Sequence, residues 1–174
     1  MAISRNKFLR GDIRGTRAPL RPPWAVSEAE FVELCSRCDD CLRNCPEHIL
    51  VRGPSGFPAV DFSRGACTFC HACADVCRPG VLYYEVGLIP WHMSLQISDA
   101  CLARQGVMCQ VCAEQCGEQA ITMRPQPGWV PAPEINIERC TGCGACYRPC
   151  PTHAIQIYRD PDRHQPKFTE EISE

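Results

Sequence analysis

Sixteen of the 174 residues are cysteines, and they fall into four sets of four rather than being scattered. The sets are Cys35, Cys38, Cys41 and Cys45 (set one); Cys67, Cys70, Cys73 and Cys77 (set two); Cys101, Cys109, Cys112 and Cys116 (set three); and Cys140, Cys143, Cys146 and Cys150 (set four). Sets one, two and four have the spacing C-x2-C-x2-C-x3-C, whereas seven residues separate Cys101 from Cys109 in set three. Groups of thiolates bind soft metal ions and iron–sulfur clusters, so these residues predict metal centres.

This spacing is typical of bacterial ferredoxins that bind 4Fe-4S clusters. Three thiolates on one short loop can each reach a different iron of a cubane, and the fourth cysteine binds the other cluster in two-cluster ferredoxins. Small residues make such a loop easy to fold, as in residues 141–145 (Thr-Gly-Cys-Gly-Ala). The sequence therefore predicts four 4Fe-4S clusters with all sixteen cysteines as metal ligands. It predicts three clusters if the seven-residue spacer after Cys101 does not return that cysteine to the other cysteines of set three.

Zinc and disulfide bonds are the alternative uses of these cysteines. Zinc sites use pairs of CxxC motifs, usually without a third cysteine two residues further on. Disulfides need an oxidising compartment and do not explain a tetrad that is repeated four times. Cys35 and Cys67 are also 32 residues apart, as are Cys45 and Cys77, which favours duplicated modules.

Composition narrows the possible classes of protein. Leu, Ile, Val and Phe together make up 36 of the 174 residues, which is close to the range where chains cannot bury an adequate core. A net charge of −2 argues against a uniformly basic nucleic-acid binder, and no apolar stretch is long enough for a transmembrane helix. The chain also contains no phosphate-binding glycine loop or nucleophile motif, so we expect no enzyme activity.

Short helices and hairpins are expected to position the cysteines. Ser27 and Glu30 form a capping box at the start of a helix that ends at Leu34. Strands are expected at residues 49–52, 59–62, 81–86, 95–97, 120–124, 134–137 and 154–158, with a loop at 125–131. Each cysteine set would be followed by half a turn of helix and a short strand.

These elements predict an α+β fold with two ferredoxin-like two-cluster modules. The expected divisions are a basic N-terminal arm (1–23), a module with sets one and two (24–90), a module with sets three and four (91–160), and a polar C-terminal tail (161–174). We favour pairing of adjacent sets, because a hairpin pattern spans each pair. Nested pairing, of set one with four and set two with three, is the alternative.

The arm carries six basic residues and one acidic residue, so its charge is +5 against −7 for the rest of the chain. It is either a partner-binding segment or a solvated terminus. Residues 4–10 partly match a twin-arginine export signal, but Asn6 replaces the second arginine and charged residues follow instead of an apolar segment. We therefore expect a cytoplasmic protein.

Several histidines and tryptophans could also take part in chemistry. His48 and His153 each lie three residues after the last cysteine of a set, where a polar turn position is favoured over proton coupling to a cluster. His71 lies between two cysteines, but its tetrad is complete without it. The three tryptophans are interpreted as packing or cluster-shielding residues.

Features beyond the cysteines resemble one family. They are Phe8-Leu9-Arg10-Gly11, Arg21-Pro22-Pro23-Trp24, Gly56-Phe57-Pro58, Asp61-Phe62, Cys67-Thr68-Phe69-Cys70 and Asp99-Ala100-Cys101-Leu102-Ala103. The chain resembles the ferredoxin-type NapF family, accessory proteins of the periplasmic nitrate reductase system, over residues 5–160. The resemblance implies a cytoplasmic protein that interacts with the nitrate reductase catalytic subunit before export. It also implies a role in maturation of that subunit, by cluster insertion or electron supply. A ferredoxin-like electron carrier for a reductase is the alternative function.

Overall fold

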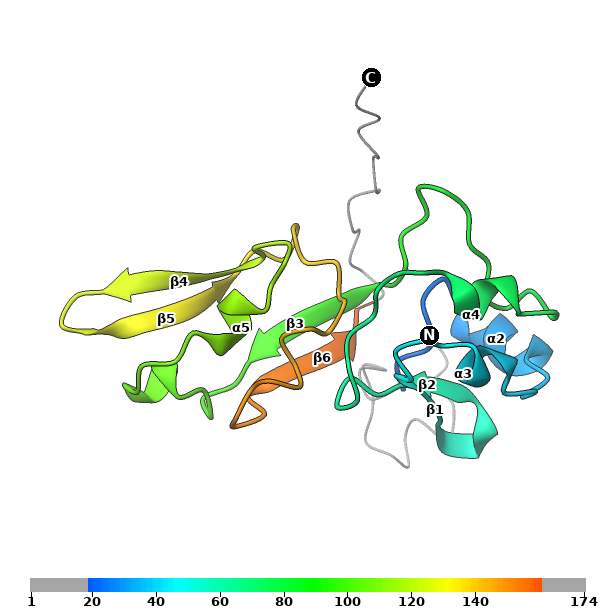
Figure 1. The fold of residues 1–174 in the computed structure, drawn as a ribbon, viewed down its shortest axis with the longest axis horizontal. Coiled ribbons are helices and arrows are strands. Elements are labelled where there is room, and N and C mark those ends of the chain that lie inside the picture. Colours follow the sequence, from blue (N-terminus) through cyan, green and yellow to red (C-terminus); the bar gives the residue numbers. More distant parts are fainter. Residues whose placement is uncertain (1–18, 161–174) are drawn as a thin grey trace, which may run out of the picture.

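The computed structural model describes residues 19–160, and the fold is shown in Figure 1. Most of the predicted arm and the whole predicted tail therefore lie outside the described residues. The helices are α2 (Glu28–Leu34), α3 (Asp40–Arg43), α4 (Ala72–Asp75), α5 (Val111–Glu114) and two 3-10 turns, η1 (Pro54–Gly56) and η2 (Ala103–Gln105). The strands are β1 (Leu50–Arg52), β2 (Pro58–Val60), β3 (Met93–Ile97), β4 (Ile121–Gln126), β5 (Trp129–Ile135) and β6 (Ile155–Arg159).

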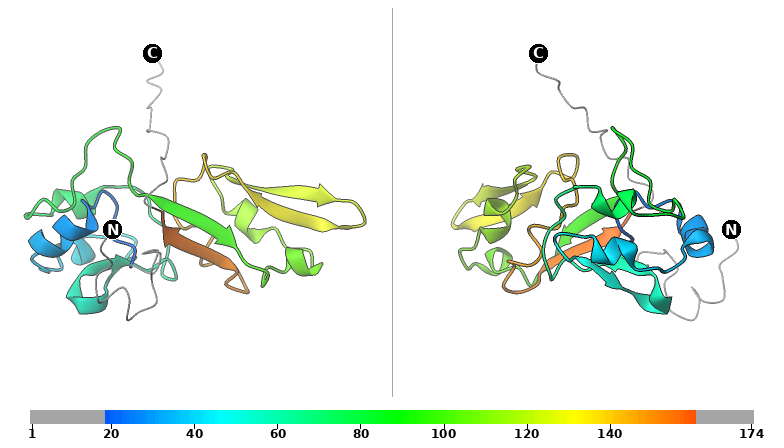
Figure 2. Two further views of the ribbon diagram at one scale, coloured as in Figure 1. Left: turned by 180° about the vertical axis from the view of Figure 1, so that it is seen from behind. Right: turned by 45° about the vertical axis from the view of Figure 1, so that its right-hand side comes forward.

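The strands form three antiparallel two-stranded sheets, β1–β2, β3–β6 and β4–β5. The β1–β2 and β4–β5 sheets are local hairpins. In the third sheet, β3 precedes set three and β6 follows set four, so their pairing joins the beginning and the end of the C-terminal half (Figures 1 and 2). The N-terminal half is closed in a corresponding way by an antiparallel bridge between Ala25 and Leu82. Each half therefore has a hairpin between two cysteine sets and a pairing that joins its ends.

The buried apolar residues form two cores. The N-terminal core contains residues of the first half together with Trp91 and Met93, and the C-terminal core contains residues between Leu95 and Ile155. The N-terminal core is centred on Phe31, Ile49 and Met93, which are almost fully buried. Tyr147 and Ile157 pack against both cores and link the two halves.

The predicted start of α2 is confirmed. Ser27 is the N-cap, its hydroxyl accepts the backbone N–H of Glu30, and the Glu30 carboxylate accepts the backbone N–H of Ser27. Phe31 is the buried residue of this helix, so a single aromatic ring anchors it to the core.

Three expectations about secondary structure are wrong. Residues 125–131 do not form a long loop, because β4 and β5 continue to a tight turn at Gly128. Residues 81–86 contribute only the bridge at Leu82. The half turns of helix lie inside sets one, two and three rather than after them, since α3, α4 and α5 each contain a cysteine.

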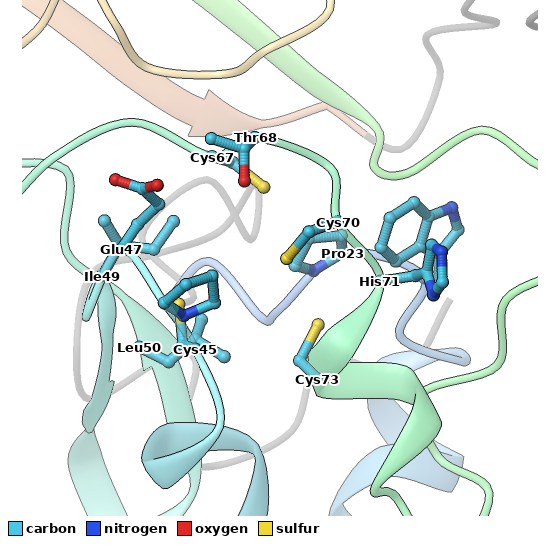
Figure 3. A pocket seen from close by; sticks show the side chains of 12 residues that line it. Pro23, Cys45, Glu47, Ile49, Leu50, Cys67, Thr68, Cys70, His71 and Cys73 are labelled. Carbon is cyan, nitrogen blue, oxygen red and sulfur yellow. The ribbon is translucent and has the colours of Figure 1, made fainter.

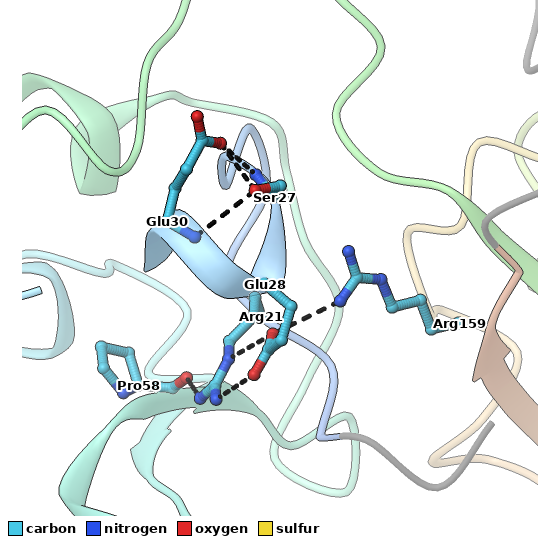
Figure 4. A network of polar contacts seen from close by, with 6 residues as sticks. All are labelled: Arg21, Ser27, Glu28, Glu30, Pro58 and Arg159. Atoms are coloured by element: carbon cyan, nitrogen blue, oxygen red, sulfur yellow. Dashed lines mark hydrogen bonds and ion pairs between the residues drawn. The ribbon is translucent and has the colours of Figure 1, made fainter. Parts of the chain in front are cut away.

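The packed body begins before residue 24, so the predicted arm boundary needs correction. Pro22 is almost fully buried, and the carbonyl of Leu20 accepts the backbone N–H of Val60 at 2.8 Å. Arg21 binds the Glu28 carboxylate through two nitrogens, at 2.7 and 3.1 Å, and the carbonyl of Pro58 at 2.9 Å (Figure 4). Residues 19–23 are therefore a strap that ties α2 to the first hairpin.

Candidate metal-cluster sites

Cysteines from neighbouring sets line shared pockets in a crossed pattern. Each pocket receives three cysteines from one set and the last cysteine of the adjacent set. The pockets are site A, with Cys35, Cys38, Cys41 and Cys77; site B, with Cys45, Cys67, Cys70 and Cys73; and site D, with Cys101, Cys109, Cys112 and Cys150. The spaces at sites A, B and D, open solvent included, are about 330, 330 and 350 Å³, so the three sites are similar in size.

The remaining four cysteines, Cys116, Cys140, Cys143 and Cys146, are assigned to site C. Burial, followed by the charges of the nearby thiols of Cys140, Cys143, Cys112 and Cys116, raises the pKa of Cys146 to about 12. Site C therefore repeats the crossed pattern, with three cysteines from set four and one from set three.

Site B shows how these pockets are built (Figure 3). Cys67, Cys70 and Cys73 lie along one segment, and Cys45 lies across the pocket from them. Apolar side chains, including Pro23 and Ile49, complete the lining together with Glu47, Thr68 and His71. Pro23 belongs to the strap, so the segment before α2 contributes directly to this site.

The long spacer of set three does bring Cys101 back to its set. Residues 103–105 form η2, and the guanidinium of Arg104 donates to the carbonyl of Ile97 at 2.6 Å. Gly106 then turns the chain with φ +83°, under the ring of Trp129. Cys101 consequently lies buried with the other cysteines of site D.

Backbone conformation around the second cysteine of three sets is unusual and repeated. In sets one and two, the residues on both sides of this cysteine have φ between +49° and +63°: Arg37 and Asp39, and Phe69 and His71. In set four the equivalent residues are glycines, both with φ +78°. Successive N–H groups in such turns form concave anion-binding nests. Because a left-handed conformation costs a non-glycine residue roughly 1–2 kcal/mol, its repetition indicates that the loop shape itself is required.

The fourth cysteine of each set begins a second repeated turn. The residue three positions later has positive φ in every set, and its N–H donates to the carbonyl of the cysteine; these residues are His48, Gly80, Gln119 and His153. His48 and His153 are thus turn residues, as favoured from the sequence.

Backbone N–H groups also reach the sulfurs. Ala120 and Ala154 donate to Cys116 and Cys150 at 3.2 and 3.3 Å. Burial acts to raise the pKa of Cys150, but hydrogen bonds from the backbone N–H groups of Ala154 and Thr152 help to outweigh it, so the pKa is below its usual value. These bonds favour the thiolate, the form that binds metal.

Several other thiols are held in the opposite state by the protein alone. Burial raises the pKa of Cys41, Cys67 and Cys73 to about 12, and that of Cys112 to about 11. The charges of nearby thiols supply a smaller part of these increases, because clustered thiolates repel one another. A positively charged iron core is therefore the group that these pockets need in order to hold four thiolates.

The geometry does not suit a single metal ion. Across residues 19–160, no group of three or more His, Cys, Asp or Glu side chains is arranged to hold one. A zinc ion bound to four thiolates at about 2.3 Å would keep the sulfurs within about 4 Å of each other. The four-cysteine pockets suit a larger group in which each thiolate binds a separate metal atom.

The other aromatic residues have structural partners. The His71 ring stacks on Tyr84 with centroids 4.6 Å apart, and its Nδ1 lies 2.9 Å from the Asp75 carboxylate. Trp24 and Trp91 are buried, as predicted for packing residues, but Trp129 is 57% exposed.

No helix within the part of the chain that the structure describes is long and apolar enough to cross a membrane.

The fold and the four-cysteine pockets define a protein of the iron–sulfur class. The family model of the 4Fe-4S dicluster domain matches residues 34–81 and again residues 107–167, so the chain carries multiple 4Fe-4S clusters. The second match begins after Cys101, the cysteine that the sequence pattern alone placed least well.

Comparison with curated proteins identifies the family more closely. The chain is 41% identical over 152 residues to the ferredoxin-type protein NapF of Escherichia coli (strain K12), covering 87% of this chain and 92% of the relative. It is 39% identical over 165 residues to NapF of Haemophilus influenzae, covering 89% and 93%. Identity to the ferredoxin-type protein NapG of E. coli K12 is 31% over 157 residues, covering 79% and 68%. The chain belongs to the ferredoxin-type NapF family.

Proposed function

We propose that this protein holds four 4Fe-4S clusters, one in each of sites A to D, with all sixteen cysteines as ligands. The crossed pattern carries this proposal, because a fourth cysteine that binds the neighbouring cluster is the rule in two-cluster ferredoxins. It also supports two modules formed by adjacent cysteine sets, residues 24–90 with the strap at 19–23 packed onto them, and residues 91–160. The clusters would supply one-electron redox chemistry, and the protein's own contribution is the nests, the N–H donors to sulfur and the apolar walls.

Iron analysis tests the cluster number. Anaerobically purified protein should contain about 16 iron atoms per chain, and Cys109→Ser should reduce this to about 12. Cys101→Ser should have the same effect, because Cys101 lines site D with Cys109. An iron content that is unchanged in Cys101→Ser would exclude Cys101 as an essential ligand. Zinc in place of iron would contradict the proposal as a whole.

The proposed role is to assist maturation of the periplasmic nitrate reductase catalytic subunit in the cytoplasm, before that subunit is exported. The observation that carries it is 41% identity to NapF over 87% of the chain. Maturation could take the form of cluster insertion or of reductive activation. A general electron carrier is the second candidate. The close approach of sites B and C described below favours electron supply, which both reductive activation and a general carrier require.

Isotope transfer separates these roles. Protein loaded with iron-57 is incubated anaerobically with the catalytic subunit lacking its cluster, and in parallel with the loaded, oxidised subunit. Appearance of iron-57 in the subunit indicates cluster insertion, whereas reduction of the loaded subunit without isotope transfer indicates electron supply. A bacterial two-cluster ferredoxin at equal iron concentration is the control. If it performs as well as this protein, the chain is a general carrier; if neither transfer occurs, the proposed role is wrong.

A further inference from the structure

The loop that carries set four is docked against the N-terminal half of the molecule. The backbone N–H of Cys67 donates to the carbonyl of Cys143 at 2.8 Å, which links the cysteine loops of sites B and C directly. Beside this bond, the indole N–H of Trp91 donates to the carbonyl of Thr141 at 3.1 Å. Two cluster-binding loops from different halves are therefore joined backbone to backbone.

Two glycines make this close approach possible. A Cβ at Gly144 would lie 2.1 Å from the ring of Phe62, and a Cβ at Gly142 would lie 2.5 Å from the Met93 side chain. Both glycines are buried, and Phe62 is held in turn by an edge-to-face contact with Trp91, at 5.8 Å between ring centroids. The glycines are thus needed for docking as well as for the positive φ of the loop.

The contact puts the four sites in one order along the molecule. Sites A and B exchange the last cysteines of sets one and two, Cys45 and Cys77, and Cys150 of set four lines site D with cysteines of set three, so the sites of each half lie together. Sites A and B are neighbours in the N-terminal half, sites C and D are neighbours in the C-terminal half, and the Cys67–Cys143 bond joins B to C. The order is A, B, C, D.

We propose that this junction is an electron-transfer contact, in which Gly142 and Gly144 hold sites B and C together so that single electrons pass between the two halves. This inference rests on the proposed presence of 4Fe-4S clusters in the sites. In each transfer one electron leaves a reduced site and enters an oxidised one, and no bond or proton is exchanged. A low-potential one-electron donor outside the protein supplies the electron, and an oxidised redox partner at the far end of the row accepts it.

Magnetic coupling between reduced clusters tests the order of the sites. Two double variants of the full-length protein are compared as backgrounds, and each keeps one intact site in each half. Cys38→Ser with Cys109→Ser disables the outer sites and retains B and C, whereas Cys70→Ser with Cys143→Ser disables the inner sites and retains A and D. Both should contain about 8 iron atoms per chain. After reduction with dithionite, the B–C protein should show a split or broadened electron paramagnetic resonance signal, and the A–D protein should show two independent signals.

The glycines are tested in the B–C background. Gly144→Ala should abolish the coupling, because its Cβ would displace the Phe62 ring. Gly128→Ala is the matched control, since Gly128 also has positive φ, +70°, but no atom within 4 Å of the added Cβ. Coupling that is absent in the B–C protein, or that persists in Gly144→Ala, would overturn the proposal. The iron content is measured in the same samples, so failure of the junction is distinguished from failure of cluster binding.

Hydrogen exchange gives a second measurement that does not depend on the disabled sites. In the otherwise unaltered full-length protein, the peptide containing the Cys67 amide should exchange at least several-fold faster in Gly144→Ala than in Gly128→Ala. Equal exchange in the two variants would show that the glycine does not hold the junction, and would overturn the proposal even if the coupling variants lost iron.

Discussion

Replacing Arg21 with alanine should destabilise the cluster-loaded protein far more than removal of an ordinary surface arginine. The Arg21 side chain is only 9% exposed, although it carries a charge. It binds the Glu28 carboxylate through two nitrogens and the Pro58 carbonyl through a third, and its guanidinium lies 4.9 Å from the centroid of the Phe31 ring. Alanine would remove all of these contacts at once.

The size of the effect follows from those contacts. A hydrogen bond to a charged group contributes about 1.5–3 kcal/mol, and the low end applies here because Glu28 is about one-third exposed and also contacts Arg159 at 3.3 Å. Leaving the buried Pro58 carbonyl unpaired costs about 1–3 kcal/mol, and loss of the cation–π contact costs about 0.5–1 kcal/mol. Because such terms are not additive, we expect a total of about 3 kcal/mol.

Loss of visible absorption on heating under anaerobic conditions measures this effect. A scan at one fixed rate is needed, because cluster loss makes unfolding irreversible. For a chain of this size, 3 kcal/mol corresponds to a shift of about 6–12 °C in the bleaching temperature. The control is Arg124→Ala, which removes an ion pair with Glu134 that is exposed on both sides and is worth at most about 1 kcal/mol. If the two variants bleach within about 2 °C of each other, Arg21 does not anchor the strap.

Three further changes test the strap, the helix cap and the dependence on iron. Deleting residues 2–18 should leave visible absorption and bleaching temperature unchanged but weaken binding to the catalytic subunit at low salt. Deleting residues 2–23 should also lower the bleaching temperature, because it removes Arg21. Unchanged binding after the shorter deletion would contradict a docking role for the arm. Ser27→Ala should reduce the free energy of unfolding by about 1 kcal/mol and lower the bleaching temperature by about 2–4 °C. Glu33→Gln, on the exposed face of α2, is the control and should change neither. Equal bleaching temperatures for the two variants would show that the cap is dispensable. Removing iron with a chelator should abolish most of the far-ultraviolet circular dichroism, because cluster binding supplies folding free energy, and an apo protein with an unchanged spectrum would refute this.

The sequence was most informative where local spacing determines structure. The capping box at Ser27 and the first hairpin depend on residues only a few positions apart, and both were predicted correctly. The crossing of the fourth cysteines follows from the ferredoxin pattern once adjacent sets lie together. The left-handed residues on both sides of the second cysteine were missed in sets one and two, where neither residue is glycine. Asp39 and His71 were weak signals, because Asp and His adopt this conformation more often than most residues.

The errors arose where proline and charge depend on distant residues. Pro125, Pro131 and Pro133 favoured a loop, but β4 and β5 form a two-stranded sheet in which both strands are edges, and edge strands accept proline. Arg21 appeared to belong to a solvated basic arm, yet it is buried because Glu28 and two aromatic rings surround it. The contact of Gly144 with Phe62 joins residues far apart in sequence and leaves no trace in local spacing.

The crossed cysteines also determine when each half can be completed during synthesis. Site A needs Cys77 and site B needs Cys67, Cys70 and Cys73, so neither pocket has four thiols when only set one has been made. At about 5–20 residues per second, the ribosome needs about 2–6 s to proceed from Cys45 to Cys77. During that interval set one is an incomplete binding loop with free thiols. Site B then becomes complete at Cys73 and site A only four residues later, at Cys77, so the two sites of the half are completed almost together. Delivery of iron and sulfide to the nascent chain is therefore expected in two paired steps, one for each half, rather than in four separate ones.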